Sequence, residues 1–229
     1  MKAMFLADMM GMRKYLVQQT LMALVIGVFI DVMTEGIYAT PIFTGTMIVL
    51  SISFSVIALD EAGHWQEYRL ALPLSRASVV RGRYLSLLAV AALSIVVGVV
   101  TSGLVLVAAW LLPSVGQLAT AAETADASLY FLMVSATVLV CLGALAVMLP
   151  ICFRVGMTKA VRWIPLIGVL LFLVTFAAFS GSESMMSQLE GTMRMLATPA
   201  GNLGIIAAAA ILYGASCRLS ERLYLTRQL

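Results

Sequence analysis

The sequence predicts an all-α, polytopic membrane protein with six transmembrane helices and both termini in the cytoplasm. Hydrophobic residues make up 62% of the 229-residue chain and charged residues 11%, whereas soluble domains are near a half and a quarter. Apolar runs of membrane-spanning length recur along the chain, and the cations gather in alternate loops.

The apolar runs qualify by length, since a transmembrane helix needs about 20 mainly apolar residues. We expect spans at about 15–33, 41–59, 85–112, 129–152, 164–180 and 201–217. Residues 2–14 form either an amphipathic helix on the inner leaflet or a helical extension of the first span. No linker interrupts the chain, so we expect a single membrane domain over residues 1–229.

The loops determine the predicted orientation. Thirteen of the fourteen Lys and Arg lie on one face, which comprises the N-terminal stretch, loops 60–84 and 154–163, and the tail after Cys217. Only Arg194 lies on the other face. The positive-inside rule therefore places the first face, with both termini, in the cytoplasm of a cell with the chain in its inner (plasma) membrane. The basic balance reflects this sidedness, and we expect no nucleic-acid partner.

Sequence motifs for catalysis are absent. The chain has no G-x-x-x-x-G-K-[ST] loop to cradle ATP phosphates and no H-E-x-x-H zinc motif. His64 is the single histidine, which argues against a multi-histidine metal site and against a Ser-His-Asp triad. We therefore expect no catalytic residue, no metal and no cofactor on this chain.

The predicted spans contain almost no ionisable groups, and a charge at the bilayer centre costs about 2.5–3.5 kcal/mol. This scarcity argues against a proton- or ion-coupled transporter that works alone. Asp31 and Glu35 come closest, beside the outer interface. They are either ordinary interfacial residues or a possible outer gate that contacts substrate.

Loop 60–84 is a polar segment between the second and third spans. One side of its first part carries, at helical spacing, Trp65, Tyr68, Arg69 and Leu72. Pro73 breaks that helix, and Ser75 is positioned to N-cap a second helix that runs into the third span. We expect three cations of this second helix at the lipid headgroups, namely Arg76, Arg81 and Arg83.

Two predicted cytoplasmic loops contain distinctive sequence motifs. Loop 60–84 contains Asp60-Glu61, Trp65, Glu67-Tyr68, Leu72-Pro73-Leu74-Ser75-Arg76 and Arg83-Tyr84, and the next cytoplasmic loop contains Pro150, Phe153, Arg154, Gly156 and Lys159. This pattern resembles the permease subunits of type-two ATP-binding-cassette (ABC) exporters, in their short six-span bacterial branch. Arg83 departs from the Lys usual in that family and preserves the positive charge.

The resemblance implies a division of labour. A separate ABC ATPase subunit binds ATP and Mg²⁺, and two permease copies, as a homodimer or with a sister permease, form the path across the lipid bilayer. The first cytoplasmic loop of each copy presses into a groove of the ATPase. The coupling contacts implied on this chain are Glu67, Tyr68, Arg69 and Leu72, with Arg76 and Arg154 as supporting cations.

Other functions fit the same apolar spans. A membrane substrate-binding subunit of an importer, or an orphan channel, would lack the ATPase contact and would have a more polar span interior. An integral membrane enzyme would need polar or metal-binding residues clustered at one depth, and the sequence offers none. The apolar spans fit an amphiphilic cargo, but packing against lipid explains the same composition.

Overall fold

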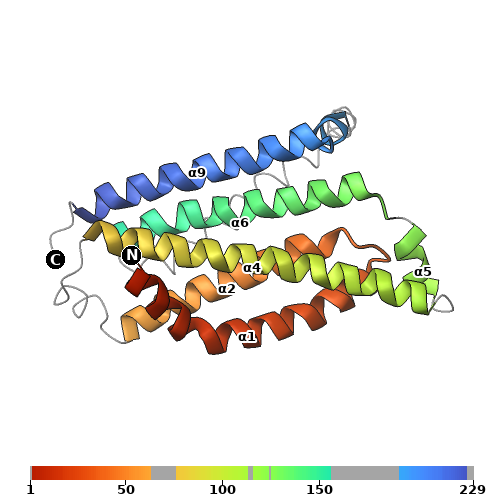
Figure 1. The fold of residues 1–229 in the computed structure, drawn as a ribbon, viewed down its shortest axis with the longest axis horizontal. Coiled ribbons are helices and arrows are strands. Elements are labelled where there is room, and N and C mark those ends of the chain that lie inside the picture. The colour runs from red at the N-terminus through yellow and green to blue at the C-terminus, as the bar shows by residue number, and fades with distance from the viewer. Residues whose placement is uncertain (1, 63–75, 113–115, 124, 156–190, 226–229) are drawn as a thin grey trace.

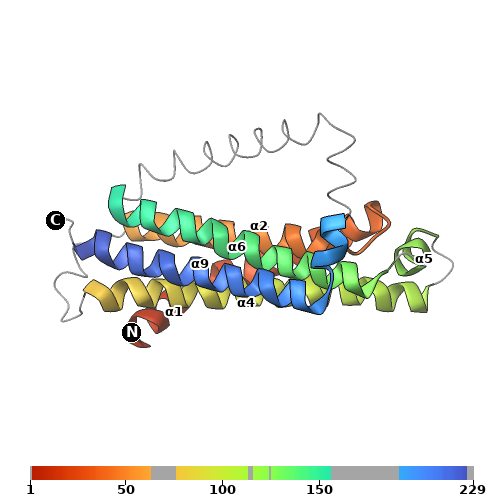
Figure 2. The ribbon, with the colours of Figure 1, turned by 90° about the horizontal axis from the view of Figure 1, so that it is seen from above.

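The structure, a computed structural model, describes residues 2–62, 76–112, 116–123, 125–155 and 191–225. Within these residues the chain is helical and contains no strand. The helices are α1 (Lys2–Met33), α2 (Ala39–Ala62), α4 (Arg76–Leu111), α5 (Gly116–Glu123), α6 (Ala127–Val155) and α9 (Pro199–Leu225). The long helices lie side by side in one bundle, and short α5 lies at one end of it (Figures 1 and 2).

Among the described residues, five helices are long and apolar enough to cross a membrane. They are Met4–Met33, Ala39–Val56, Ala77–Leu111, Ala127–Arg154 and Pro199–Tyr224, which correspond to five of the predicted spans. The remaining predicted span, 164–180, lies outside the described residues, so the count of six stays a prediction. Residues 2–14 belong to α1 and thus extend the first span, although its first turns run at an angle to the rest (Figure 1).

The local signals around loop 60–84 located the next helix well. α4 begins at Arg76, directly after the predicted cap, and continues without interruption into the third span. Pro73 and Ser75 themselves lie outside the described residues. Helix α5 was not predicted, because its eight residues, GQLATAAE, are too few to span a membrane; their Ala, Leu, Gln and Glu nevertheless favour a helix.

α4 lies between two apolar clusters. The first joins α4 to α6 and α9 and includes Tyr84, Leu87, Leu145, Leu149 and Tyr213. The second joins α4 to α1 and α2 and includes Met12, Ile48, Ile52, Val90 and Val97. In a membrane such contacts stabilise through close van der Waals packing. A displacement of α4 therefore acts on both halves of the bundle.

Two glycines allow α1, α2 and α4 to approach closely. A Cβ on Gly27 of α1 would lie 2.9 Å from a methyl carbon of Thr101 and 3.0 Å from one of Thr44. A Cβ on Gly98 of α4 would lie 2.7 Å from Thr44 Oγ1 and 3.0 Å from the Cα of Pro41. Small residues at helix crossings serve this purpose in membranes. The three helices are therefore tightly joined where α1 ends and α2 begins.

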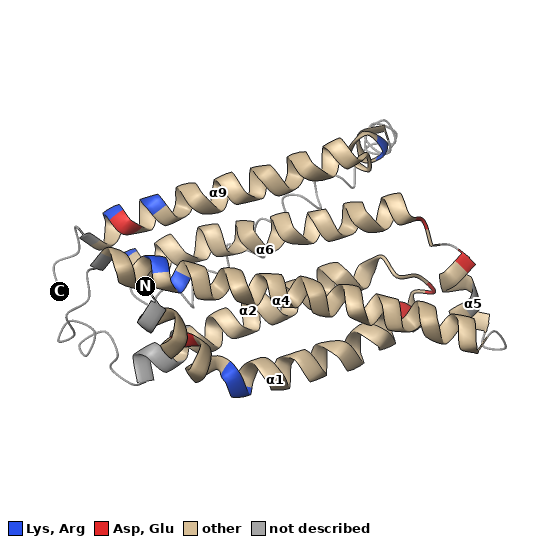
Figure 3. Cartoon of the chain, viewed as in Figure 1, with Lys and Arg blue, Asp and Glu red and all other residues tan. Residues whose placement is uncertain are grey.

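The charged residues segregate to the two ends of the bundle (Figure 3). We call the end where α1 and α4 begin and α6 and α9 end the basic end. Its described cations are Arg13, Lys14, Arg81, Arg83, Arg154, Arg218 and Arg222, accompanied by Asp8 and Glu221. At the opposite, acidic end lie Asp31, Glu35, Glu123 and Asp126, with Arg194. This is the separation that the loop charges predicted.

Candidate functional site

Of the six predicted coupling residues, only Arg76 and Arg154 belong to the described residues, and each lies at the end of a helix. Glu67, Tyr68, Arg69 and Leu72 lie outside the described residues. Arg76 is the first residue of α4, and Arg154 is exposed in the last turn of α6. Both helix ends that flank the loop, Ala62 of α2 and Arg76 of α4, lie at the basic end (Figure 1). The first turns of α4 are therefore the part of the bundle that receives any movement of the loop.

A tyrosine in these first turns ties α4 to α9 and α6. The hydroxyl of Tyr84 lies 2.8 Å from Ser216 Oγ and 2.7 Å from Ser220 Oγ, and all three side chains are buried. Ser216 Oγ donates to the carbonyl of Ala146 at 2.6 Å, so Tyr84 must be the donor to Ser216 and Ser220 the donor to Tyr84. Tyr213 Oη donates to the Tyr84 carbonyl at 2.7 Å.

A surface ion pair reinforces the same contact. Arg81 Nε lies 2.5 Å from Glu221 Oε1, and Arg81 Nη2 lies 3.2 Å from Oε2. The contact is bidentate, the geometry that a guanidinium and a carboxylate favour. Because half of the Arg81 side chain is exposed, this pair adds orientation more than stability.

The other side of α4 carries a buried ion pair with α1. Arg83 Nη1 lies 3.5 Å from Asp8 Oδ1, and the two side chains are 3% and 7% exposed. Ser86 Oγ donates to the second oxygen, Asp8 Oδ2, at 2.9 Å. This corrects the expectation that Arg83 lies at the lipid headgroups: Asp8 draws its guanidinium between the helices.

Within its first three turns, α4 is thus bonded to α1 and α9, and through Ser216 of α9 it is linked to α6. We call this set the α4-base network; its members are Asp8, Arg81, Arg83, Tyr84, Ser86, Tyr213, Ser216, Ser220 and Glu221. Of these residues, the sequence singled out Arg81, Arg83 and Tyr84, but their contacts were not predicted. A signal was present on α9, where Tyr213, Ser216 and Ser220 recur at spacings of three and four and so share one face of an apolar helix.

The two acidic residues considered as an outer gate are separated by their environments. Asp31 is fully buried at the acidic end, where its Oδ1 is hydrogen-bonded to Thr40 Oγ1. Glu35 is exposed and has a φ of 50°, in the turn that closes α1 through a hydrogen bond from the Gly36 amide to the Asp31 carbonyl at 3.2 Å. The two carboxyls therefore lie in different environments, one buried and one exposed, and the possible outer gate stays a prediction.

A family model described as "ABC-2 family transporter protein" matches residues 3–225, nearly the whole chain. The chain belongs to the ABC-2 transporter family. Members of this family are transport permeases that are generally not catalytic themselves, and they normally pair with an ATPase subunit. Comparison with curated proteins finds no match.

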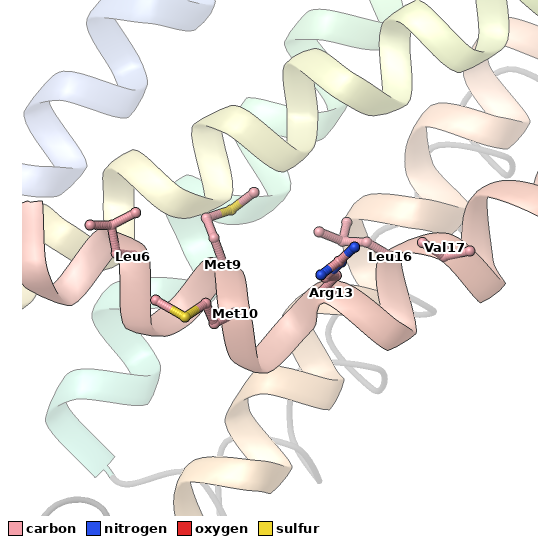
Figure 4. A pocket seen from close by; sticks show the side chains of 6 residues that line it. All are labelled: Leu6, Met9, Met10, Arg13, Leu16 and Val17. Carbon is pink, nitrogen blue, oxygen red and sulfur yellow. The ribbon is translucent and has the colours of Figure 1, made fainter.

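The described surface of this ABC-2 chain has shallow hollows. One of about 400 Å³ lies along the bent start of α1 and is lined by Leu6, Met9, Met10, Arg13, Leu16 and Val17 (Figure 4). Another of about 650 Å³ lies at the acidic end between the start of α6 and residues 193–199. No group of three or more metal-binding side chains occurs in the described part of the chain.

Proposed function

We propose that this ABC-2 chain is the membrane-spanning permease subunit of an exporter, with its basic end in the cytoplasm. A separate ATPase subunit binds ATP and Mg²⁺ and presses on loop 60–84. The observation that carries the proposal is the α4-base network. The helix that begins directly after the loop is bonded to α1 and α9 within its first three turns, and through Ser216 of α9 it is linked to α6.

The network supports a direct route for the movement. A helix behaves as a stiff rod over a few turns, so a push on the residues before Arg76 displaces Tyr84 and Arg83 together. Through Tyr84 the displacement reaches α9 and α6, and through Arg83 it reaches α1. ATP-driven closure of the ATPase would then rock the spans without any nucleotide site on this chain.

The exposed apolar surface is consistent with lipid and a second permease copy as neighbours. α1 exposes a row of large apolar side chains that includes Val17, Leu21, Val25 and Phe29, and α9 exposes Leu203, Ile211 and Leu212. Export, as opposed to import, is inferred from the resemblance of the loop motifs. It predicts that inside-out vesicles take up cargo when ATP is supplied outside.

Co-purification with the ATPase tests the proposal. The chain is co-expressed with the ATPase encoded nearest to it, as wild type, as the double variant Glu67→Ala/Arg69→Ala, and as Arg218→Ala. Arg218 is the matched control, since it is an exposed cation of the basic end outside the loop.

Truncating one partner of a desolvated interfacial charge pair costs about 2–5 kcal/mol, which corresponds to a loss of affinity of about 30-fold or more. We expect the loop variant to lose the ATPase while Arg218→Ala retains it. Unchanged co-purification and unchanged ATP hydrolysis in the loop variant would remove the coupling assignment.

A further inference from the structure

Asp31 is the one fully buried acidic or basic side chain, among the described residues, that has no opposite charge. The other two deeply buried charged side chains, Asp8 and Arg83, neutralise each other. Asp31 is 0% exposed, lies within the span Met4–Met33, and forms no ion pair in the described part of the chain. An unpaired charge in such a place is expensive. Some positive species must therefore accompany this carboxyl.

The two contacts of Thr40 beside the carboxyl require one more proton than the Thr40 hydroxyl supplies. Thr40 Oγ1 is within hydrogen-bond distance of Asp31 Oδ1 and lies 3.0 Å from the carbonyl oxygen of Gly27. A hydroxyl donates a single proton, whereas a carbonyl and an ionised carboxylate only accept. Both contacts are satisfied together when Asp31 carries the proton. Asp31 then donates to Thr40, and Thr40 donates to Gly27.

The surrounding helices offer no other neutralising group. α2 contributes Thr40, α4 contributes Ser102, which donates to the Ile37 carbonyl at 3.4 Å, and α6 contributes the phenol of Tyr130. Asp31 Oδ2 is buried, and the Ser102 hydroxyl is also a polar neighbour of this carboxyl. The remaining described acidic groups of this end, Glu35, Glu123 and Asp126, are exposed and negative, so they cannot compensate the charge.

We propose that Asp31 is a proton-binding site, and that its proton holds the acidic ends of α1 and α2 closed. When the proton leaves to water, a bare carboxylate competes with Gly27 for the Thr40 hydroxyl in a dry site. The helices must then part to admit water, because the close approach at Gly27 leaves no room for it in the closed packing. The site goes beyond the transport role and does not depend on coupling to an ATPase.

Infrared spectroscopy tests the site on the full chain in phosphatidylcholine vesicles at neutral pH. A protonated carboxyl has a carbonyl stretch distinct from that of a carboxylate. We expect one such band in wild type, its loss in Asp31→Asn, and its retention in Glu35→Gln, the nearby exposed carboxyl. Asn is suited to the test because its amide can donate to Thr40 as the protonated acid does, which preserves the fold. A wild type without the band, or a band that survives in Asp31→Asn, overturns the proposal.

A second measurement tests whether the proton on Asp31 stabilises the closed packing of α1 and α2. The thermal unfolding midpoint of wild type should fall by several degrees as the pH is raised from mildly acidic to alkaline, and Asp31→Asn should lose this dependence while Glu35→Gln keeps it. A midpoint with the same pH dependence in wild type and Asp31→Asn contradicts the proposal. A midpoint that instead rises by about 5–10 °C in saturating Na⁺ over choline, at equal ionic strength, identifies a metal-cation site and refutes the proton.

Discussion

Removing the carboxylate of Asp8 will destabilise the chain, because the buried guanidinium of Arg83 loses the negative charge of that carboxylate. The two side chains are 3% and 7% exposed, so bulk water does not replace the lost partner. Breaking a buried ion pair by removing one member costs about 3–5 kcal/mol. For a protein of about 150–250 residues each kcal/mol lowers the unfolding midpoint by about 2–4 °C, so Asp8→Ala should lower it by roughly 6–20 °C.

The assay compares thermal unfolding of wild type, Asp8→Ala, Arg83→Met and the double variant, all purified in one detergent. Met fills much of the space of the arginine side chain without a charge, so the double variant should be more stable than Asp8→Ala. Asp8→Asn is the matched control, because its amide oxygen still accepts from Ser86 while the charge is lost. Equal losses on Asp8→Ala in the wild-type and Arg83→Met backgrounds would refute the pairing.

Three further variants probe the bundle. Gly98→Ala should lower the unfolding midpoint strongly, since its Cβ would lie 2.7 Å from Thr44 Oγ1; a midpoint equal to wild type would contradict the close approach. Tyr84→Phe removes the hydroxyl that joins α4 to two serines of α9, at a cost of about 1–3 kcal/mol, and should lower ATP-driven movement of α9 in the assembled complex. Glu221→Gln should barely change the midpoint, because its partner Arg81 is half exposed; a large, salt-sensitive loss would show that the pair is stronger than its exposure implies.

Hydropathy, together with helix-breaking and helix-capping residues, predicted most of the described fold. Five apolar runs correspond to five long apolar helices, because each run is long enough to satisfy its own backbone hydrogen bonds across a bilayer. The start of α4 at Arg76 was predicted from two nearby residues, Pro73 as the expected end of one helix and Ser75 as the expected cap of the next. These are properties of neighbouring residues, and a sequence displays them directly.

The buried polar contacts could not be predicted in the same way. From the sequence, an arginine near the start of a membrane helix is expected to contact lipid headgroups. Arg83 is instead buried beside Asp8, which lies 75 residues earlier in the chain. Asp31 likewise stands at the end of an apolar run, as an interfacial residue would. Its burial depends on Thr40, Ser102 and Tyr130 from three other helices. Such sites depend on which helices meet, and hydropathy does not encode this.

The central claim, that an ATPase moves this chain through loop 60–84 and the α4-base network, is tested most directly by hydrogen–deuterium exchange. The complex of the chain with its ATPase is compared with and without a non-hydrolysable ATP analogue. We predict that exchange changes together in the first turns of α4 and in residues 213–221 of α9, and that Glu67→Ala/Arg69→Ala abolishes both changes. Unaltered exchange in the first turns of α4, with changes confined to other helices, would contradict the account.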